Sequence, residues 1–354
     1  MSQFVIKRSR VLSSQSMEPS PAVSSDKNPR SFFDYLPKDT DFKSNIECVF
    51  KSSGFLKLVL LSISPTQNRN VSLFRGSDHH STPVKSLFYV HFVFKPDYFM
   101  IQSMMEGQSM YTCISLSKDH LKKYTFAKEP SNNSETIDVA VPLQAILICV
   151  SMFSQNHEIS MSYNFEEKQI ILRGNCTNFD KYKYISDAGQ FLLCKLKTIS
   201  ATPLNIPFED LFFNIHKYDY FTICPKLLYS CFSDVTTDST STRMILEVTP
   251  PTQNSTHILG MSRENSAIIV QWDFSFDKNI FEDYRITKSH LYKYSTKCIH
   301  CVTNGLKISD TCKVMIKENG ALLIKTSISW NMSEEISLYY YICPFIDSDT
   351  KSTH

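Results

Sequence analysis

Cysteine and histidine residues towards the C-terminal end of the chain are the first candidates for chemistry. Cys298, His300 and Cys301 stand close together, and Cys312 follows further along. Thiolate and imidazole groups are ligands that zinc prefers, but structural zinc sites need two paired ligand groups at defined spacing. The second pair is missing, and Cys298 and Cys301 also fit the apolar side of an expected helix. The pattern therefore predicts buried thiols and no metal.

Paired carboxylates are the second set of candidates, because metal-dependent nucleases hold their ions with clustered acidic side chains. The acidic pairs are Glu166-Glu167, Glu209-Asp210 and Glu282-Asp283, and no Asp-x-Glu occurs. Each pair falls where a turn is expected, not on neighbouring strands. Nothing in the chain favours a Ser/His/Asp or a Cys/His catalytic arrangement. We therefore expect no catalytic activity and no cofactor.

Composition narrows the functional classes further. The chain has 354 residues, of which 42% are hydrophobic and 20% charged, enough to build the cores of about two domains. A net charge of +2 argues against a histone-like protein but is compatible with one local basic face. With only 8 glycines, the chain contains neither G-x-G-x-x-G nor G-x-x-x-x-G-K-[ST], which argues against Rossmann dehydrogenases, P-loop ATPases and protein kinases.

Cysteine usage and hydropathy indicate the compartment. The 11 cysteines are odd in number and mostly sit within apolar runs, as reduced thiols do. The N-terminus has no apolar signal segment, and the apolar runs near Phe55 and Leu143 are too short to span a bilayer. These features are typical of a soluble intracellular protein.

The chain divides into two similar halves behind an N-terminal tail. Residues 1–43 are rich in Ser and Pro and read as a disordered tail, in which Lys7-Arg8-Ser9-Arg10 is either a nuclear-import patch or a solvated charge cluster. A pattern of strand, short helix and further strands then occurs four times. We expect its helices near residues 54–64, after Pro142, after Pro225 and over Ser289–Val302. The spacing predicts domains at 44–196 and 212–346, a connector at 197–211 and a short tail at 347–354.

Three segments carry a resemblance to a known family. Tyr98–Phe126 (YFMIQSMMEGQSMYTCISLSKDHLKKYTF) has the strand, tight turn and strand of the sliding-clamp signature. Leu204–Pro207 is similar to the connector of the replicative clamp, and the Tyr-Tyr-x-Cys-Pro ending at Tyr340–Pro344 is similar to that of a checkpoint clamp subunit. With Cys194–Thr198, these segments resemble the Rad-one (Rad-seventeen-type) family of the sliding-clamp superfamily.

The resemblance implies an α+β DNA clamp fold: two similar domains, each with two short helices on the inner face and antiparallel sheets outside. It implies a non-catalytic subunit of a heterotrimeric checkpoint clamp that encircles double-stranded DNA at damage sites and supports checkpoint signalling and repair. The implied partners are Rad-nine-like and Hus-one-like subunits and an ATP-driven clamp loader, with no membrane, in the nucleus. The resemblance leaves two alternatives, a 3′→5′ exonuclease of the same family and a homotrimeric replicative-type clamp.

The family also suggests where the functional surfaces lie. The helices should face DNA phosphates, although the second helix carries Ala145 and Ile148 and the third Cys231 and Asp234 where the replicative clamp is basic. The expected DNA-facing residues are Lys57, Lys226, His290, Lys293, Lys297 and His300. Their alternative is an ordinary solvated helix face. The expected subunit-interface edges contain Gln169, Ile171, Arg173, His257, Leu259 and Met261, unless both strands are internal. The expected partner-peptide pocket contains Leu204, Ile206 and Pro207.

Overall fold

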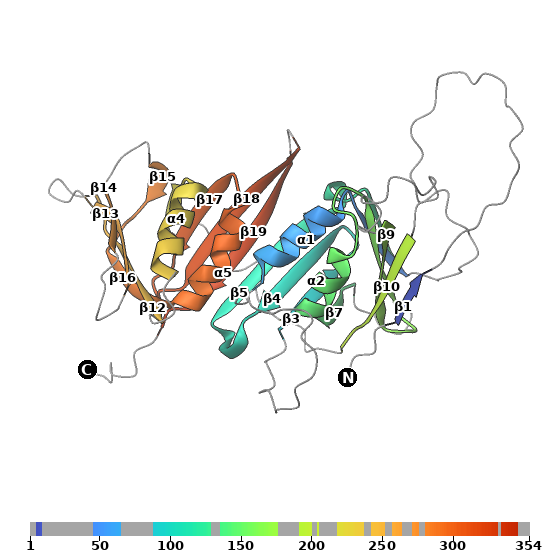
Figure 1. Ribbon diagram of the computed structural model, residues 1–354. Helices are drawn as coiled ribbons and strands as arrows, with labels where there is room; N and C mark the ends of the chain where they lie inside the picture. Colours follow the sequence, from blue (N-terminus) through green and yellow to red (C-terminus); the bar gives the residue numbers. More distant parts are fainter. Residues whose placement is uncertain are drawn as a thin grey trace, which may run out of the picture.

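The computed structural model describes residues 5–8, 45–64, 88–128, 135–175, 191–199, 204, 218–236, 242–251, 257–263, 271–275, 280–331 and 334–345. Within these residues the chain is an α+β protein, mostly strand, with four α-helices and three antiparallel sheets (Figure 1). The α+β class predicted from the sequence is therefore confirmed. None of the described helices has the length and apolar character needed to cross a membrane.

The first half of the chain contains two helices and, apart from β1, nine strands, with two short 3-10 turns, η2 (Glu106–Gln108) and η3 (Lys118–His120), between strands. Its elements are β2 (Ile46–Phe50), α1 (Ser53–Ser62), β3 (Tyr89–Phe94), β4 (Tyr98–Met104), β5 (Met110–Ser117), β6 (Lys123–Phe126), β7 (Ile137–Pro142), α2 (Leu143–Ser151), β8 (Ile159–Asn164), β9 (Gln169–Asn175) and β10 (Phe191–Lys197).

The second half contains the same kinds of element in the same order. Its elements are β11 (Asp219–Ile223), α4 (Pro225–Thr236), β12 (Arg243–Val248), β13 (His257–Arg263), β14 (Gln271–Ser275), β15 (Phe281–Arg285), β16 (His290–Ser295), α5 (Thr296–Leu306), β17 (Thr311–Ile316), β18 (Leu322–Asn331) and β19 (Glu334–Ile342).

The strand order within the sheets is also repeated. The first half forms the runs β10-β9-β8-β2-β6 and β5-β4-β3-β7, and the second forms β19-β18-β17-β11-β15 and β14-β13-β12-β16. Strand by strand, the two halves therefore have one topology. The runs are joined in the middle, where Leu338–Ile342 of β19 pair with Met110–Ile114 of β5 and produce a continuous nine-stranded sheet.

One short strand contradicts the prediction of a disordered tail. Val5–Arg8 form β1, which pairs antiparallel with Leu192–Lys195 of β10 and extends the first sheet to six strands. The composition of residues 1–43 gave no sign of this strand because it holds only two β-branched residues before two charged ones. The remaining residues of the predicted tail lie outside the described part of the chain.

Three of the four helices begin where the sequence predicts. Ser52 caps α1, since its hydroxyl oxygen accepts a 3.1 Å hydrogen bond from the Phe55 amide. Pro142 immediately precedes α2, and Pro225 opens α4, positions at which a missing N–H has no cost. Neighbouring helices contact one another in the order α4, α5, α1 and α2, and in Figure 1 they form a row between the two outer sheets.

The fourth helix is shorter than predicted and begins later. Residues 290–295 form strand β16, and α5 starts only at Thr296. The sequence is ambiguous here because His290, Tyr292 and Tyr294 alternate with Leu291 and Lys293 as in a strand, whereas Leu291, Tyr294 and Cys298 also fit a helical spacing. Pairing of β16 along the whole of β12 decides in favour of the strand.

A glycine allows α5 to lie close to the nine-stranded sheet. A Cβ atom on Gly305 would overlap the hydroxyl of Tyr340 and would stand 2.7 Å from a methyl group of Leu338, both on β19. The Tyr340 hydroxyl in turn donates a 3.0 Å hydrogen bond to the carbonyl of Ser62 at the end of α1. Gly305 thus sits where two helices from different halves meet the central sheet.

We predict that Gly305→Ala destabilises the protein although alanine is the better helix former. Overlap with Tyr340 and Leu338 should cost about 1–3 kcal/mol of unfolding free energy, measured by chemical denaturation. Adding Tyr340→Phe removes the overlapping oxygen, so the double variant should lose less stability than the sum of the two single variants. An alanine variant as stable as the wild type would contradict this packing.

Candidate nucleic-acid interface

The exposed side of α5 carries a polar stripe at helical spacing. Lys297 and Lys307 are exposed, with the partly exposed His300 and Asn304 between them. Positions 297, 300, 304 and 307 follow one face of a helix, while the opposite face is buried in the core. Lys307, directly after the helix, was missed because the predicted helix ended at Val302. The spacing of Lys307 from Lys297 was the signal that could have identified it.

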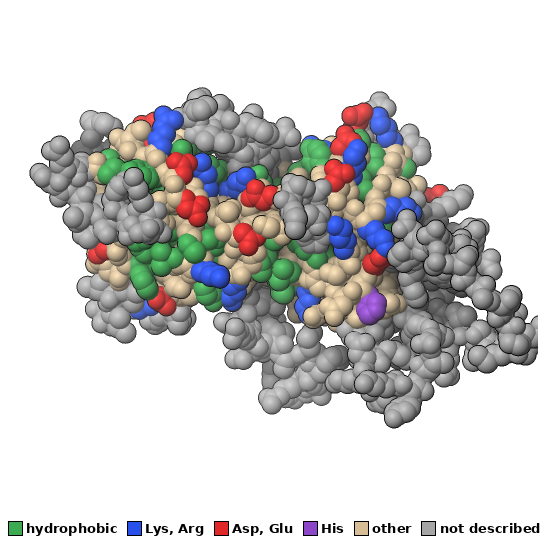
Figure 2. All heavy atoms as spheres, turned by 90° about the horizontal axis from the view of Figure 1, so that it is seen from above, with side chains coloured by type: hydrophobic (Ala, Val, Ile, Leu, Met, Phe, Trp, Pro, Cys, Tyr) green, Lys and Arg blue, Asp and Glu red, His purple; other side chains and the backbone are tan. Residues whose placement is uncertain are grey.

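The other helices contribute fewer cations. Lys226 is exposed on α4 and Lys57 is partly exposed on α1, where Leu58 and Leu61 are its exposed neighbours. The helix α2 presents no basic side chain, because it contains none. The helix row is therefore only weakly positive. Figure 2 shows another face of the molecule, on which the described basic, acidic and apolar side chains are intermingled.

His300 links two helices and does not add charge at neutral pH. Its Nδ1 atom lies 3.0 Å from the hydroxyl oxygen of Thr236 at the end of α4. Burial lowers the pKa of His300 below its ordinary value of 6.5, and the positive charge of Lys307 lowers this pKa further. The imidazole therefore stays neutral at neutral pH and acts as a hydrogen-bonding group. Of the two predicted DNA-facing histidines, only this one lies on a helix.

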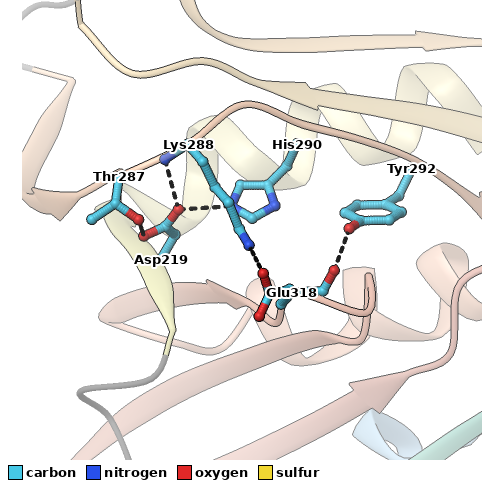
Figure 3. Close-up of polar contacts among 6 residues, drawn as sticks. All are labelled: Asp219, Thr287, Lys288, His290, Tyr292 and Glu318. Carbon is cyan, nitrogen blue, oxygen red and sulfur yellow. Dashed lines mark hydrogen bonds and ion pairs between the residues drawn. The ribbon is translucent and has the colours of Figure 1, made fainter.

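The structure contradicts the prediction that His290 faces DNA. His290 begins β16, is 3% exposed, and its Nε2 atom lies 2.7 Å from an Asp219 carboxylate oxygen (Figure 3). The same carboxylate accepts a 2.7 Å hydrogen bond from the Thr287 hydroxyl and a 3.3 Å bond from the Lys288 amide. Because Asp219 is on β11 and His290 on β16, the cluster ties the nine-stranded sheet to the four-stranded sheet.

Lys293 is also not on a helix. It belongs to β16, opposite Ile245 of β12, and alternates with the buried His290 and Tyr294. Successive side chains of a strand point to opposite faces. Lys293 therefore lies on the outer face of the four-stranded sheet, and its assignment to the helix stripe was wrong because the helix begins after it.

The two strands predicted to be subunit-interface edges are internal strands of their sheets. The strand β9, which contains Gln169, Ile171 and Arg173, pairs with β8 on one side and β10 on the other. The strand β13, which contains His257, Leu259 and Met261, pairs with β12 and β14. The true outermost strands at these positions are one step further out. In the second half the outermost described strand is β14; in the first half it would be β10, except that β1 pairs with β10 and is itself outermost.

Only part of the predicted connector pocket can be placed. Leu204 is partly buried, whereas Ile206 and Pro207 lie outside the described residues. A small apolar cluster that the sequence did not indicate lies on the nine-stranded sheet. Its buried members are Tyr218, Met315 and Leu323, and Tyr220 and Tyr341 pack against them. Tyr341 alternates with Tyr340, which faces the helices, so this cluster occupies the opposite face of the sheet.

The candidates for metal and acid chemistry are dispersed. No group of three or more His, Cys, Asp or Glu side chains suited to a metal occurs within the described part of the chain. Cys298 and Cys301 are buried beside the Met105 thioether, each with its sulfur 3.9 Å from the Met105 sulfur. Burial raises the pKa of Cys298, so it remains a neutral thiol.

The three acidic pairs of the sequence analysis are also not brought together among the described residues. Glu166-Glu167 form a turn after β8, as predicted, and Glu167 lies 3.3 Å from the ammonium of Lys195. Glu282-Asp283 lie within β15, not in the predicted turn. Glu209-Asp210 fall outside the described residues.

Comparison with known proteins provides no family assignment. Neither a protein-family model nor a curated protein sequence matches this chain.

We predict that Asp219→Asn lowers the unfolding free energy at neutral pH and makes that free energy less sensitive to acid. Burial alone would raise the pKa of Asp219, but hydrogen bonds from His290, Thr287 and Lys288 outweigh burial and hold it below the ordinary 3.8. The wild-type protein should therefore lose this stabilisation as the pH falls through 3.8 towards the lower folded value. The amide should cost about 1–3 kcal/mol at neutral pH and should flatten the acid limb of the stability curve.

The matched control is Glu318→Gln. Glu318 pairs with Lys288 near the same cluster, but it is exposed, so its replacement should change thermal stability little. Equal destabilisation by both substitutions would show that the buried cluster has no special role.

Proposed function

We propose that this protein is a non-catalytic subunit of a heterotrimeric checkpoint clamp that encircles double-stranded DNA in the nucleus and supports damage signalling and repair. The observation that carries the proposal is the repeated topology of the two halves, joined edge to edge through β19 and β5. The resemblance of Tyr98–Phe126 and Tyr340–Pro344 to checkpoint clamp segments points in the same direction.

The repeated topology supports a ring because it leaves complementary strands at opposite ends of the chain. β19 and β10 hold equivalent positions in their halves, as do β5 and β14. Inside the chain, β19 pairs with β5. By the same pairing, β10 of one subunit would pair with β14 of the next. A head-to-tail contact of this kind generates a ring when its rotation closes. Main-chain pairing at a sheet edge supplies the affinity.

The helix row supports a sliding contact with DNA. Lysines on such a row would contact phosphates, which carry no sequence information, and salt would screen those contacts. Lys226, Lys297 and Lys307 are exposed, Lys57 is partly exposed, and all four lie on or beside the row. Their small number favours weak, exchangeable binding. The enclosure of the duplex by the ring, and not tight binding, would then keep the protein on DNA.

The composition of the natural complex tests this proposal. Tagged protein purified from its own cells should carry two different clamp-like chains in equal amounts, as measured by native mass spectrometry. Three copies of this chain would instead indicate the homotrimeric alternative.

A nuclease assay tests the exonuclease alternative. Purified protein with Mg²⁺ and a 3′-labelled DNA should release no nucleotides. Release that disappears on changing an acidic pair would establish the exonuclease instead.

We predict that charge reversal on α5 weakens the contact of the assembled complex with DNA. The double variant Lys297→Glu and Lys307→Glu should lower DNA affinity and reduce the slope of log affinity against log salt by about 1 for each phosphate-contacting lysine. Fluorescence anisotropy at several salt concentrations measures both quantities.

Lys325→Glu is the control for a charge reversal away from the helices, and it is compared with each single variant, Lys297→Glu or Lys307→Glu. Lys325 pairs with Tyr339 across β18 and β19, so it lies on the sheet face opposite Tyr340 and the helices. It should leave the affinity and the salt slope nearly unchanged. Equal losses in both variants would exclude the helix row as the DNA-facing surface.

A further inference from the structure

The strand β1 occupies one of the two sheet ends that a ring would need. Val5, Ile6, Lys7 and Arg8 pair with Lys195, Cys194, Leu193 and Leu192 of β10, respectively. At the other end, β14 pairs with β13 on one side, and the described residues provide no strand on its other side. Within the described residues, one sheet end is therefore uncovered and the other is covered by the chain's own N-terminal segment.

The internal joint shows what should pair with β10. In the second half, β19 holds the position of β10 and is covered directly by β5, with no strand between them. A strand left in place at β10 would insert one additional strand width of about 4.8 Å into the joint between subunits. That joint would then differ from the one inside the chain. Equivalent joints require that β1 leave β10 before a partner edge can pair with it.

We propose that β1 is an intramolecular cover that prevents β10 from pairing with the β14 edge of a second copy, and that a partner subunit displaces it during assembly. This inference rests on the proposed function for the identity of the displacing edge, but the covering itself concerns this chain alone. Uncovered strand edges pair indiscriminately, and proteins protect them with short or charged strands. β1 has both properties: it is four residues long and ends in Lys7 and Arg8.

The pairing lengths are consistent with a cover that can be displaced. The joint between β19 and β5 includes five residue pairs, whereas β1 and β10 form four. A partner strand as long as β5 could therefore form at least as many backbone hydrogen bonds as β1 does. Its attachment to a folded sheet would also lower the entropy cost of ordering it, compared with a chain terminus.

The test compares the mass of three forms of the full protein in solution. The wild type should remain at the 40.8 kDa of one chain as its concentration rises. A variant lacking residues 1–10 should self-associate, and light scattering should show a mass that rises to two and more chains. A variant with Lys7→Cys and Leu193→Cys joins residues that are directly opposite in the β1–β10 register. Such residues are about 4.5–5.5 Å apart, within reach of a disulfide. Its oxidised form should stay at one chain.

A peptide added in trans separates specific pairing from general aggregation. The peptide of residues 1–10, MSQFVIKRSR, should return the truncated variant to the mass of one chain. The same peptide with Ile6→Pro should fail, because proline has no N–H to donate to a neighbouring strand. Unchanged thermal melting of the truncated variant would show that it remains folded.

Two results would overturn the inference. One is a truncated variant that stays at the mass of one chain, and the other is self-association that the MSQFVIKRSR peptide does not reverse. Neither result bears on the proposed clamp function, which is decided by the chains found in the purified complex. Conversely, a complex without clamp-like partners would refute the proposed function but would leave the covering of β10 to be decided by these masses.

Discussion

The pairing of strand edges is the constraint on which this structure depends. Backbone N–H and C=O groups at the margin of a sheet must find partners, and each bond contributes about 1 kcal/mol. Inside the chain this requirement is met by joining β19 of one half to β5 of the other. The same requirement recurs at the two ends, where β10 is covered by β1 and β14 has a strand on one side only among the described residues. The arrangement of the whole molecule follows from how these edges are satisfied.

The helices depend on the sheets for their positions. Each is only 9–12 residues long, too short to be stable alone in water, so packing must hold it in place. Gly305 and Tyr340 fix α5 and the end of α1 against β19. The hydrogen bond between Thr236 and His300 connects α4 to α5. The polar stripe of α5 therefore faces outward because the opposite side of the helix is held by specific contacts.

Much of the local structure could be predicted from the sequence, because its signals are local. Pro142 and Pro225 mark helix starts, and the apolar spacing after Phe55 marks α1. Such signals fail where two periodicities coincide, as at residues 290–295, where alternation of Tyr292 and Tyr294 competes with a helical spacing. The burial of His290 depends on Asp219, which is distant in the chain and becomes its partner only when β11 and β16 come together.

The existence of a strand was easier to predict than its position in the sheet, because which strand is outermost is a property of the whole sheet. Residues 169–174 and 257–261 have the composition of edges and of internal strands alike, and only the pairing of β10 and β14 beyond them makes them internal. Likewise, Val5–Arg8 have too little apolar character to predict a strand from the sequence. They form one only because they pair with β10. Lys307 was not predicted as part of the stripe because the predicted helix ended at Val302, before this residue.

The continuous nine-stranded sheet has a mechanical consequence. A hinge between the two halves would have to break the β19–β5 ladder, and it would also have to separate α1 from α5 and break the hydrogen bond from the Tyr340 hydroxyl to the Ser62 carbonyl. Bending at this point is therefore resisted by both layers of the molecule at once. In the ring that we propose, a deformation large enough to admit a DNA duplex would therefore concentrate at the contacts between separate chains, and each chain would move as a rigid unit.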